Sequence, residues 1–247
     1  MSGQTWLVLG ASSAIARAFA RLAARRGDGV ILAGRDREDL ETLAKDLAVR
    51  GAASAHVLRF DALDMAAHGD FARDCRRLAP GRLSVFLAFA SMDDQASVDA
   101  EPDLALATIN AGFTGAVSVL HRLAPELEAQ EGGHVIALGS VAGDRGRRKN
   151  YVYGAAKAGL HTYLQGLRAR LLRHGVTVTT VKPGFVDTAM TFGRPGLFLV
   201  ATPRAVAEAA LDAALKHRDE VYAPRFWALI MLIIKLIPER VMKRLDI

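Results

Sequence analysis

Two side chains in the segment 139–157, GSVAGDRGRRKNYVYGAAK, have types and spacing that suit proton transfer. Tyr153 and Lys157 are four residues apart, so on a helix they share one face and the ammonium lies near the phenol. A close positive charge favours the phenolate, and we therefore expect the pKa of Tyr153 to lie below the ordinary value of about 10. The phenol can then act as an acid or a base. Because such pairs are common on helices, the rest of the chain has to support this interpretation.

A third residue of the same segment could contact a substrate. Ser140 directly follows the apolar run HVIALG, which is typical of a buried strand. Its hydroxyl would lie at the carboxyl end of a parallel strand, where ligands bind in open α/β sheets. We therefore expect Ser140 to hydrogen-bond a substrate oxygen.

Six apolar runs alternate with helix-length segments and predict the scaffold that positions these residues. The runs are TWLVLG, VILAG, AHVLRF, LSVFLAFA, HVIALG and VTVTTVKP. This alternation predicts an α/β fold with one Rossmann-type, doubly wound parallel sheet flanked by helices. We expect residues 1–224 to form a dinucleotide-binding catalytic domain. Residues 225–247 would be an apolar and basic helical extension of that domain.

The composition limits the classes of function. With 247 residues, of which 51% are apolar and 23% charged, the chain can bury the core of one large domain. Cys75 is the single cysteine, so an intrachain disulfide is excluded, and the seven histidines have no metal-ligand spacing. We therefore expect no metal. The start, MSGQTWLVLG, does not read as a secretory signal, which favours a cytoplasmic protein.

The net charge of +6 indicates an anionic ligand, a membrane surface or nucleic acid, although dispersed surface arginines would also explain it. Aromatic residues do not interleave with the basic clusters. Nucleic acid is therefore not an expected partner.

The turn after the first apolar run predicts a dinucleotide site. The sequence from Gly10 to Ala16, GASSAIA, leads into an Ala-rich helical segment. Glycine and small residues would let the backbone approach a pyrophosphate at the helix N-terminus. The alternative is a tight turn without a ligand, because Ala14 and Ala16 stand where glycine is usual.

The end of the second run bears on which dinucleotide binds. Arg35 follows Gly34 where cofactor folds that use NAD usually place an acidic side chain. A guanidinium suits a 2′-phosphate instead, so Arg35 favours NADP(H). Alternatively, Arg35 only begins a solvated helix together with Arg37 and Glu38.

Later segments offer further contacts for the cofactor and for the reaction. Asp61, after the third run, could accept a hydrogen bond from adenine or cap a helix starting near Leu63. The small residues around Phe89, at the end of the fourth run, would allow a cofactor to pass, although packing explains them equally well. Asn110 is polar within the apolar segment TINAGFTGAVSVL, either as a satisfied core amide or as part of a proton relay.

These residues together resemble the short-chain dehydrogenase/reductase family over essentially the whole chain. The resemblance implies that Tyr153 is the general acid or base, supported by Lys157, that Ser140 orients the substrate carbonyl, and that Asn110 holds a relay water. The chain departs from the family at Ala14 and Ala16, where glycine is usual, and at the turn Ala88–Ala90, where the family has Asn-Ala-Gly. The expected cofactor-binding residues are Gly10, Ser12, Ser13, Ile15, Arg35, Asp61, Ala62, Ala88, Phe89, Ala90, Tyr153, Lys157, Pro183, Gly184 and Thr188.

Four segments resemble the decaprenylphosphoryl-2-keto-erythropentose reductase branch of that family: FDALD, INAGFTGAVSV, GDRGRRKNYVYGAAKAGL and the C-terminal segment 222–247. The branch implies NADPH-dependent reduction of a keto-sugar on a polyprenyl phosphate, which feeds cell-wall arabinan synthesis. Arg145, Arg147 and Arg148 would suit the substrate phosphate, unless they lie in a solvated loop.

The apolar run from Phe226 to Ile237 is too short to span a bilayer and is followed by basic residues. It could lie on a membrane surface between residues 226 and 244, or form a dimer or lid helix. The resemblance also implies a homodimer or homotetramer through the helix 154–171. The alternatives are a carbonyl or 3-oxoacyl reductase with a soluble substrate, and an NADP-binding sensor or scaffold without catalysis.

Overall fold

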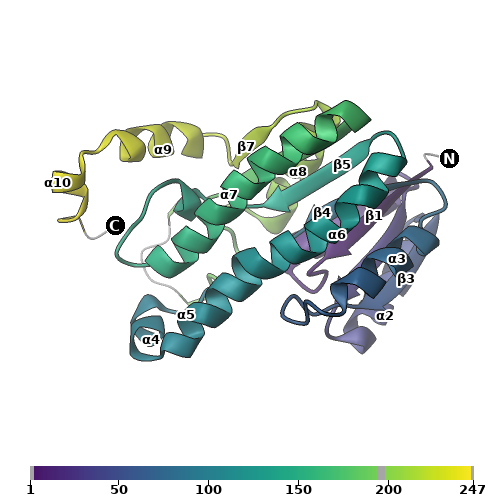
Figure 1. The fold of residues 1–247 in the computed structure, drawn as a ribbon, viewed down its shortest axis with the longest axis horizontal. Helices are drawn as coiled ribbons and strands as arrows, with labels where there is room; N and C mark the ends of the chain where they lie inside the picture. The colour runs from purple at the N-terminus through teal and green to yellow at the C-terminus, as the bar shows by residue number, and fades with distance from the viewer. Residues whose placement is uncertain (1–2, 194–197, 246–247) are drawn as a thin grey trace.

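The centre of the molecule is a parallel sheet of seven strands, seen in a computed structural model that describes residues 3–193 and 198–245 (Figure 1). The strand order is β3-β2-β1-β4-β5-β6-β7. The order reverses beside β1, and in open α/β sheets such a reversal opens a crevice at the carboxyl ends of the strands. The strands are β1 (Gln4–Leu9), β2 (Gly29–Gly34), β3 (Ser54–Arg59), β4 (Arg82–Leu87), β5 (Gly133–Leu138), β6 (Val176–Pro183) and β7 (Glu220–Ala223).

The six apolar runs of the sequence all form strands, but β7 was not predicted. It is four residues long, begins with the exposed Glu220 and pairs in parallel with β6 at the edge of the sheet. A short edge strand buries little apolar surface, so its sequence carries a weak pattern.

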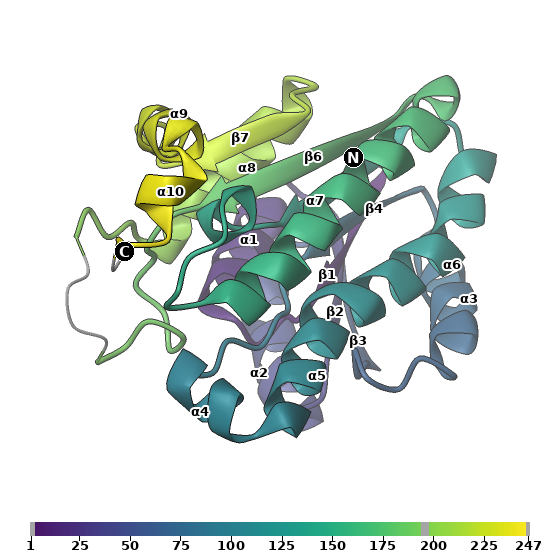
Figure 2. The same cartoon turned by 60° about the vertical axis from the view of Figure 1, so that its left-hand side comes forward.

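Helices cover both faces of the sheet, as Figure 2 shows. Alternate residues of β1 point to opposite faces: Trp6 and Val8 join one buried cluster, Leu7 and Leu9 the other. The first cluster is covered by α1 (Ala14–Arg25), α2 (Arg37–Val49) and α8 (Pro203–Leu215), and the second by α3 (His68–Leu78), α6 (Gly115–Ala129) and α7 (Tyr151–Leu171).

The apolar segment around Asn110 is not one regular α-helix. A π-helical turn, η1 (Asn110–Thr114), separates α5 (Pro102–Ile109) from α6. By length and composition the segment Pro102–Ala129 could cross a membrane. However, Val119, Leu120 and Leu123 are fully buried in the core against the sheet. The α6 part of the segment therefore packs in the core of this fold.

The C-terminal extension forms two helices that extend from one side of the body (Figure 1). Trp227 and Met231 are buried against Val141, so the first of these helices is anchored beside Ser140. The helices are α9 (Trp227–Leu236) and α10 (Glu239–Met242), and the remaining short elements are α4 (Gln95–Ala100), η2 (Val141–Asp144) and η3 (Leu172–His174).

Candidate active site

A cavity of about 830 Å³ opens at the carboxyl ends of the strands. The fifteen residues predicted to hold a cofactor all line it, and Ser140 and Arg147 line it as well. Asn110 is not among the lining residues, although its helical neighbours Ala107 and Ala111 are. The cavity therefore brings together most of the chemistry that the sequence suggested, from seven separate segments of the chain.

Tyr153 and Lys157 lie one turn apart near the start of α7, as their spacing predicted. Lys157 is only 2% exposed, and its Nζ donates a 2.8 Å hydrogen bond to the carbonyl oxygen of Leu138. The same Nζ lies 5.9 Å from the centre of the Tyr153 ring. Burial lowers the pKa of Lys157 to about 8, so the ammonium still predominates at neutral pH. A positive charge therefore stands close to the phenol.

Ser140 follows β5 in extended conformation and caps η2. Its Oγ accepts a 3.1 Å hydrogen bond from the backbone N–H of Ala142. Since Oγ is the acceptor in that bond, its own hydrogen is left to be donated toward the cavity. The backbone N–H of Ser140 donates to Nε2 of His161 at 3.3 Å.

The turn after β1 fits a pyrophosphate although two of the usual glycines are replaced. Gly10 has φ of +75°, and a Cβ there would lie 2.9 Å from Cβ of Phe89 and 3.0 Å from its backbone nitrogen. Ser13 caps α1 by accepting a 3.2 Å bond from the N–H of Ala16. The single glycine that the geometry requires is present, and the start of the twelve-residue α1 faces the cavity.

Two arginines line the end of the cavity next to this turn. Arg35 is exposed at the end of β2, whereas the neighbouring Asp36 caps α2 by accepting from the N–H of Asp39 at 3.1 Å. Arg17 was not predicted. It donates from Nε to the carbonyl oxygen of Ser12 at 3.2 Å and pairs with Asp39. Its signal in the sequence is its position one turn after Ser13, on the helix that the dinucleotide turn begins.

Asp61 lies in a turn and not at the start of a helix. Its Oδ1 accepts a 3.0 Å bond from the N–H of Leu63, but α3 begins only at His68. The ring of the buried His68 bonds the carbonyl oxygen of Asp61 at 2.9 Å and Oγ of Ser118 at 3.0 Å. The expected helix near Leu63 is therefore wrong, because His68 fixes this loop in another conformation.

The three arginines before α7 lie in different environments. Arg145 is tied to α10, with bonds of 2.7 Å to Glu239 and 3.1 Å to the carbonyl oxygen of Ile237, and Arg148 is exposed. Arg147 lines the cavity, and its buried Nε has no hydrogen-bond partner. Burial lowers the pKa of Arg147, which the carboxylate of Asp144 opposes. Of the three arginines predicted to bind a substrate phosphate, only Arg147 therefore lines the cavity.

Asn150 also lines the cavity beside Tyr153 and was not predicted. Its Oδ1 is buried without a hydrogen-bond partner, as is Nε of Arg147. Buried polar atoms are nearly always satisfied, so this pair suggests that a polar ligand belongs here.

The segment after β6 lines the cavity with Pro183, Gly184 and Thr188. A Cβ on Gly184 would lie 1.9 Å from Nε1 of Trp227, so this glycine is required by the packing of α9. The backbone N–H of Thr188 donates to Oγ1 of Thr191 at 3.2 Å. The C-terminal extension therefore supports the wall of the cavity.

Within residues 3–193 and 198–245, no group of three His, Cys, Asp or Glu side chains could hold a metal ion. Cys75 is buried and free, and burial raises the pKa of its thiol. A fully buried thiol of raised pKa is a poor nucleophile.

Comparisons with known proteins bear on the family and the fold of this chain. The family model described as short chain dehydrogenase matches residues 4–194. An uncharacterized oxidoreductase of Mycobacterium tuberculosis is 34% identical over 241 residues, which cover 97% of this chain and 96% of that protein. An uncharacterized oxidoreductase of Streptomyces coelicolor is 36% identical over 242 residues, covering 97% and 94%.

Among solved structures, a 3-oxoacyl (acyl-carrier-protein) reductase of Agrobacterium tumefaciens with NADP bound has the same fold. Its TM-score is 0.80 at 22% identity, with 89% of this chain and 92% of that chain covered.

Proposed function

Because the chain belongs to the short chain dehydrogenase family and is an oxidoreductase, we propose that it reduces a carbonyl to an alcohol with NADPH. The observation that carries the proposal is that Ser140, Tyr153 and Lys157 line the same cavity as the Gly10 turn. When bound, the cofactor supplies the hydride. A catalytically idle sensor would have no need for these three side chains together.

In this proposal the substrate carbonyl lies between Ser140 and Tyr153. Ser140 donates its hydroxyl hydrogen to the carbonyl oxygen and holds it in place. Tyr153 donates its phenolic proton to that oxygen as the alcohol forms. The ammonium of Lys157, 5.9 Å from the phenol ring, stabilises the phenolate that remains. Asn110 is proposed to hold a water that returns the proton.

The preference for NADPH over NADH is proposed to come from Arg35. The structure supports this because Arg35 is exposed at the cavity while Asp36 is engaged in capping α2. Arg35→Ser should weaken NADPH binding about tenfold and leave NADH binding unchanged. The matched control is Arg37→Ser, since Arg37 pairs with Glu41 at 2.7 Å. Equal loss of both cofactors would rule out a phosphate contact.

The substrate is proposed to be a keto-sugar on a polyprenyl phosphate. Arg147 supports an anionic substrate, since its buried Nε lacks a partner at the substrate end of the cavity. Arg147→Met should raise KM for a polyprenylphosphoryl keto-pentose at least tenfold, whereas the exposed Arg148→Met should not. An unchanged KM for the polyprenylphosphoryl keto-pentose in Arg147→Met, together with a higher kcat/KM of the wild type for neutral ketones or 3-oxoacyl thioesters, would favour a soluble substrate without a phosphate.

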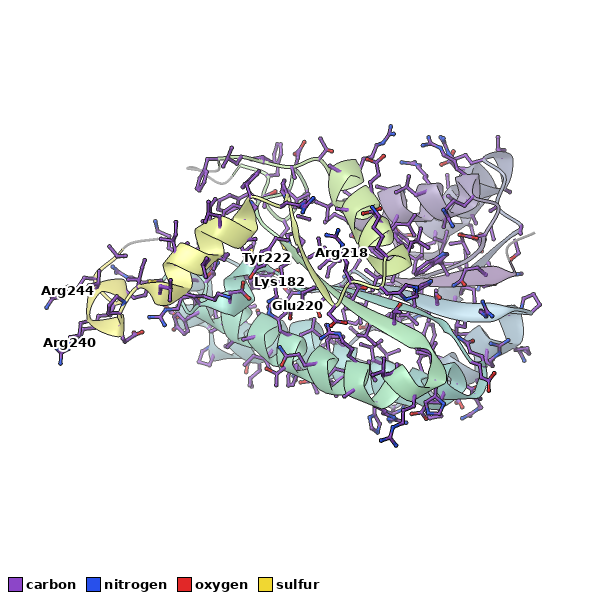
Figure 3. The ribbon with its side chains drawn as sticks, turned by 90° about the horizontal axis from the view of Figure 1, so that it is seen from above. Lys182, Arg218, Glu220, Tyr222, Arg240 and Arg244 are labelled. Atoms are coloured by element: carbon purple, nitrogen blue, oxygen red, sulfur yellow. The ribbon has the colours of Figure 1, made fainter. Side chains whose placement is uncertain are left out.

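The outer face of α9 supports contact with a membrane that carries such a lipid. Leu229, Leu232, Ile233 and Leu236 are all more than half exposed there, next to the exposed Lys235. Arg240 and Arg244 point away from the body at the far end of α10 (Figure 3). Apolar side chains beside cations suit the surface of an anionic bilayer. We propose that the protein is cytoplasmic and meets the membrane through residues 226–244.

Flotation with anionic vesicles tests this contact. Because Trp227 and Met231 are buried, the surface is better tested by substitution than by truncation. Leu232→Asp combined with Ile233→Asp should abolish flotation. Val49→Asp combined with Leu172→Asp is the control, since both of these side chains are exposed elsewhere. Failure of the wild-type protein to float with phosphatidylglycerol vesicles would remove the membrane from the proposal.

A homodimer or homotetramer is proposed to form through α6 and α7. A hollow of about 600 Å³ lies there and is lined by Phe113, Gly159, Tyr163 and Gly166, among others. Gly159 and Gly166 have no side chain, which supports the close approach of a second copy on this face. Gly166→Arg should shift the mass measured by light scattering to that of a monomer, and an unchanged mass would exclude this face.

A further inference from the structure

A cluster of ionisable side chains, built on the buried Asp144, His161 and Lys182, lies next to Ser140. We call it the Asp144 cluster; its members are Asp144, His161, Lys182, Glu220 and Tyr222. Lys182, Glu220 and Tyr222 are close together on β6 and β7 in Figure 3. None of these five residues was predicted to be functional, and none of the five is among the residues that line the cavity.

The carboxylate of Asp144 holds the cluster together. Its Oδ1 lies 3.0 Å from Nζ of Lys182, and its Oδ2 accepts a 2.6 Å bond from the hydroxyl of Tyr222. Lys182 also pairs with Glu220 at 2.9 Å. The side chains of Asp144 and Lys182 are both more than nine-tenths buried. Buried charges that are paired and hydrogen-bonded in this way fix the positions of their partners.

The ring of His161 connects the cluster to Ser140. Its Nε2 accepts the backbone N–H of Ser140 at 3.3 Å, and its Nδ1 faces Oδ1 of Asp144 at 3.7 Å. A Cβ on Gly139 would lie 2.3 Å from Nε2, and a Cβ on Gly143 would lie 2.7 Å from the ring carbon Cε1. The imidazole therefore fits closely between two glycines on either side of Ser140, where larger residues would displace it.

The ring has to be neutral for this contact. Because Nε2 accepts a hydrogen bond, it carries no proton, and the ring hydrogen belongs on Nδ1, which faces Asp144. Burial, then the positive charge of Lys182, lowers the pKa of His161 to about 4, with Lys157 acting in the same direction and Asp144 and Glu220 opposing it. The ring is thus neutral across the ordinary pH range.

We propose that His161 is a positioning residue: held by the Asp144 cluster, it fixes the backbone of Ser140 and thereby the direction of the hydroxyl toward the substrate oxygen. The inference rests on the proposed carbonyl reduction, because Ser140 has its role there. It assigns a function to a buried histidine on the face of α7 that also carries Tyr153 and Lys157.

The test compares two variants in the full-length protein with NADPH and a ketone that the wild type reduces. His161→Met fills the space without an acceptor at Nε2, whereas the amide oxygen of His161→Gln can replace Nε2. We expect His161→Met to lower kcat about tenfold with unchanged NADPH affinity, and His161→Gln to retain kcat within about twofold. Unchanged kcat in His161→Met, or equal losses in both variants, would overturn the proposal.

A double-mutant cycle separates positioning from general stability. If His161 acts through Ser140, His161→Met should cause no further loss of kcat in a Ser140→Ala background. Independent tenfold losses in both backgrounds would overturn the proposal. Absence of ketone reduction by the wild type would instead count against the proposed function itself.

The ring ¹⁵N shifts of histidine-labelled wild-type protein test the tautomer without a variant that has to fold. We expect His161 to be neutral with its proton on Nδ1 from pH 5 to 8. A charged ring, or a proton on Nε2, would contradict the bond from Ser140.

Discussion

The two ends of the cavity are built in different ways. At the end beside β1 and β2, the wall consists of the Gly10 turn, small residues and the start of α1, with Arg17 and Arg35 beside them. At the end beside β5 and β6, the wall consists of side chains that are held by specific hydrogen bonds. Lys157 donates to the carbonyl oxygen of Leu138, and the backbone N–H of Ser140 donates to the ring of His161. Apart from the proposed role of Arg35, the first end depends on the shape of the backbone, whereas the second depends on the identity of its side chains.

This difference explains why the chain can depart from its family at one end and not at the other. Ala14 and Ala16 stand where the family has glycine, but both lie in α1, and within this turn only Gly10 has a positive φ. At the other end Ser140, Tyr153 and Lys157 are all present. Substitutions at the two ends should therefore differ in the size of their effects and in whether they change turnover or cofactor binding.

The largest effect should come from the proton donor. Tyr153→Phe keeps the ring and removes the hydroxyl, so kcat for ketone reduction should fall by about 10²- to 10⁴-fold while the NADPH dissociation constant stays unchanged. Steady-state kinetics and nicotinamide fluorescence measure the two quantities. Turnover close to that of the wild type would remove Tyr153 from the mechanism.

A second effect should appear in the pH dependence of stability. The folded-state pKa of Lys157, about 8, lies below the ordinary value of 10.5, so between these values the unfolded chain binds more protons. The contribution of Lys157 to the free energy of unfolding therefore rises with pH across this window, and the cost of its buried charge is fully present below pH 8.

Lys157→Met removes the free-energy cost of the buried charge and also the hydrogen bond to the carbonyl oxygen of Leu138. We expect the variant to be more stable than wild type by about 2 kcal/mol at pH 7, with the difference shrinking as the pH approaches 10.5, while kcat falls. Urea unfolding at several pH values measures this. A variant that is less stable at every pH would show that Lys157 carries no such cost.

At the cofactor end, Gly10→Ala should act through the backbone. The new Cβ would meet the backbone of Ala88 and Phe89, and the φ of +75° is strained for alanine. We expect the NADPH dissociation constant to rise about tenfold and stability to fall by about 1–3 kcal/mol. The control is Gly146→Ala, since a Cβ on Gly146 would meet no other atom within 4 Å. Equal effects of the two changes would contradict the account.

The smallest effect should come from restoring a family glycine. Ala14→Gly lies in the first turn of α1 and should lower stability by about 0.5–1 kcal/mol, with less than about a threefold change in NADPH affinity. Thermal unfolding and a fluorescence titration measure both. A gain in affinity above tenfold would show that alanine limits cofactor binding.

The sequence predicts what depends on local patterns. The six apolar strands, the Gly10 turn and the spacing of Tyr153 and Lys157 follow from short-range periodicity and backbone conformation. The sequence could not predict that Arg147 lines the cavity while Arg145 does not. That difference depends on the bond from Arg145 to Glu239 in α10, more than ninety residues away. The link from His161 to Ser140 likewise depends on contacts between α7 and the turn after β5. The short β7 lacks the apolar run that would identify it.

The transfer of deuterium from NADPH labelled at the transferable C4 position to a ketone tests the central claim most directly. The account predicts that wild-type protein yields an alcohol with one deuterium on the carbinol carbon, and that Tyr153→Phe yields little under the same conditions. An alcohol without deuterium, or equal transfer by both proteins, would contradict the proposal that this cavity carries out carbonyl reduction with Tyr153 as the acid.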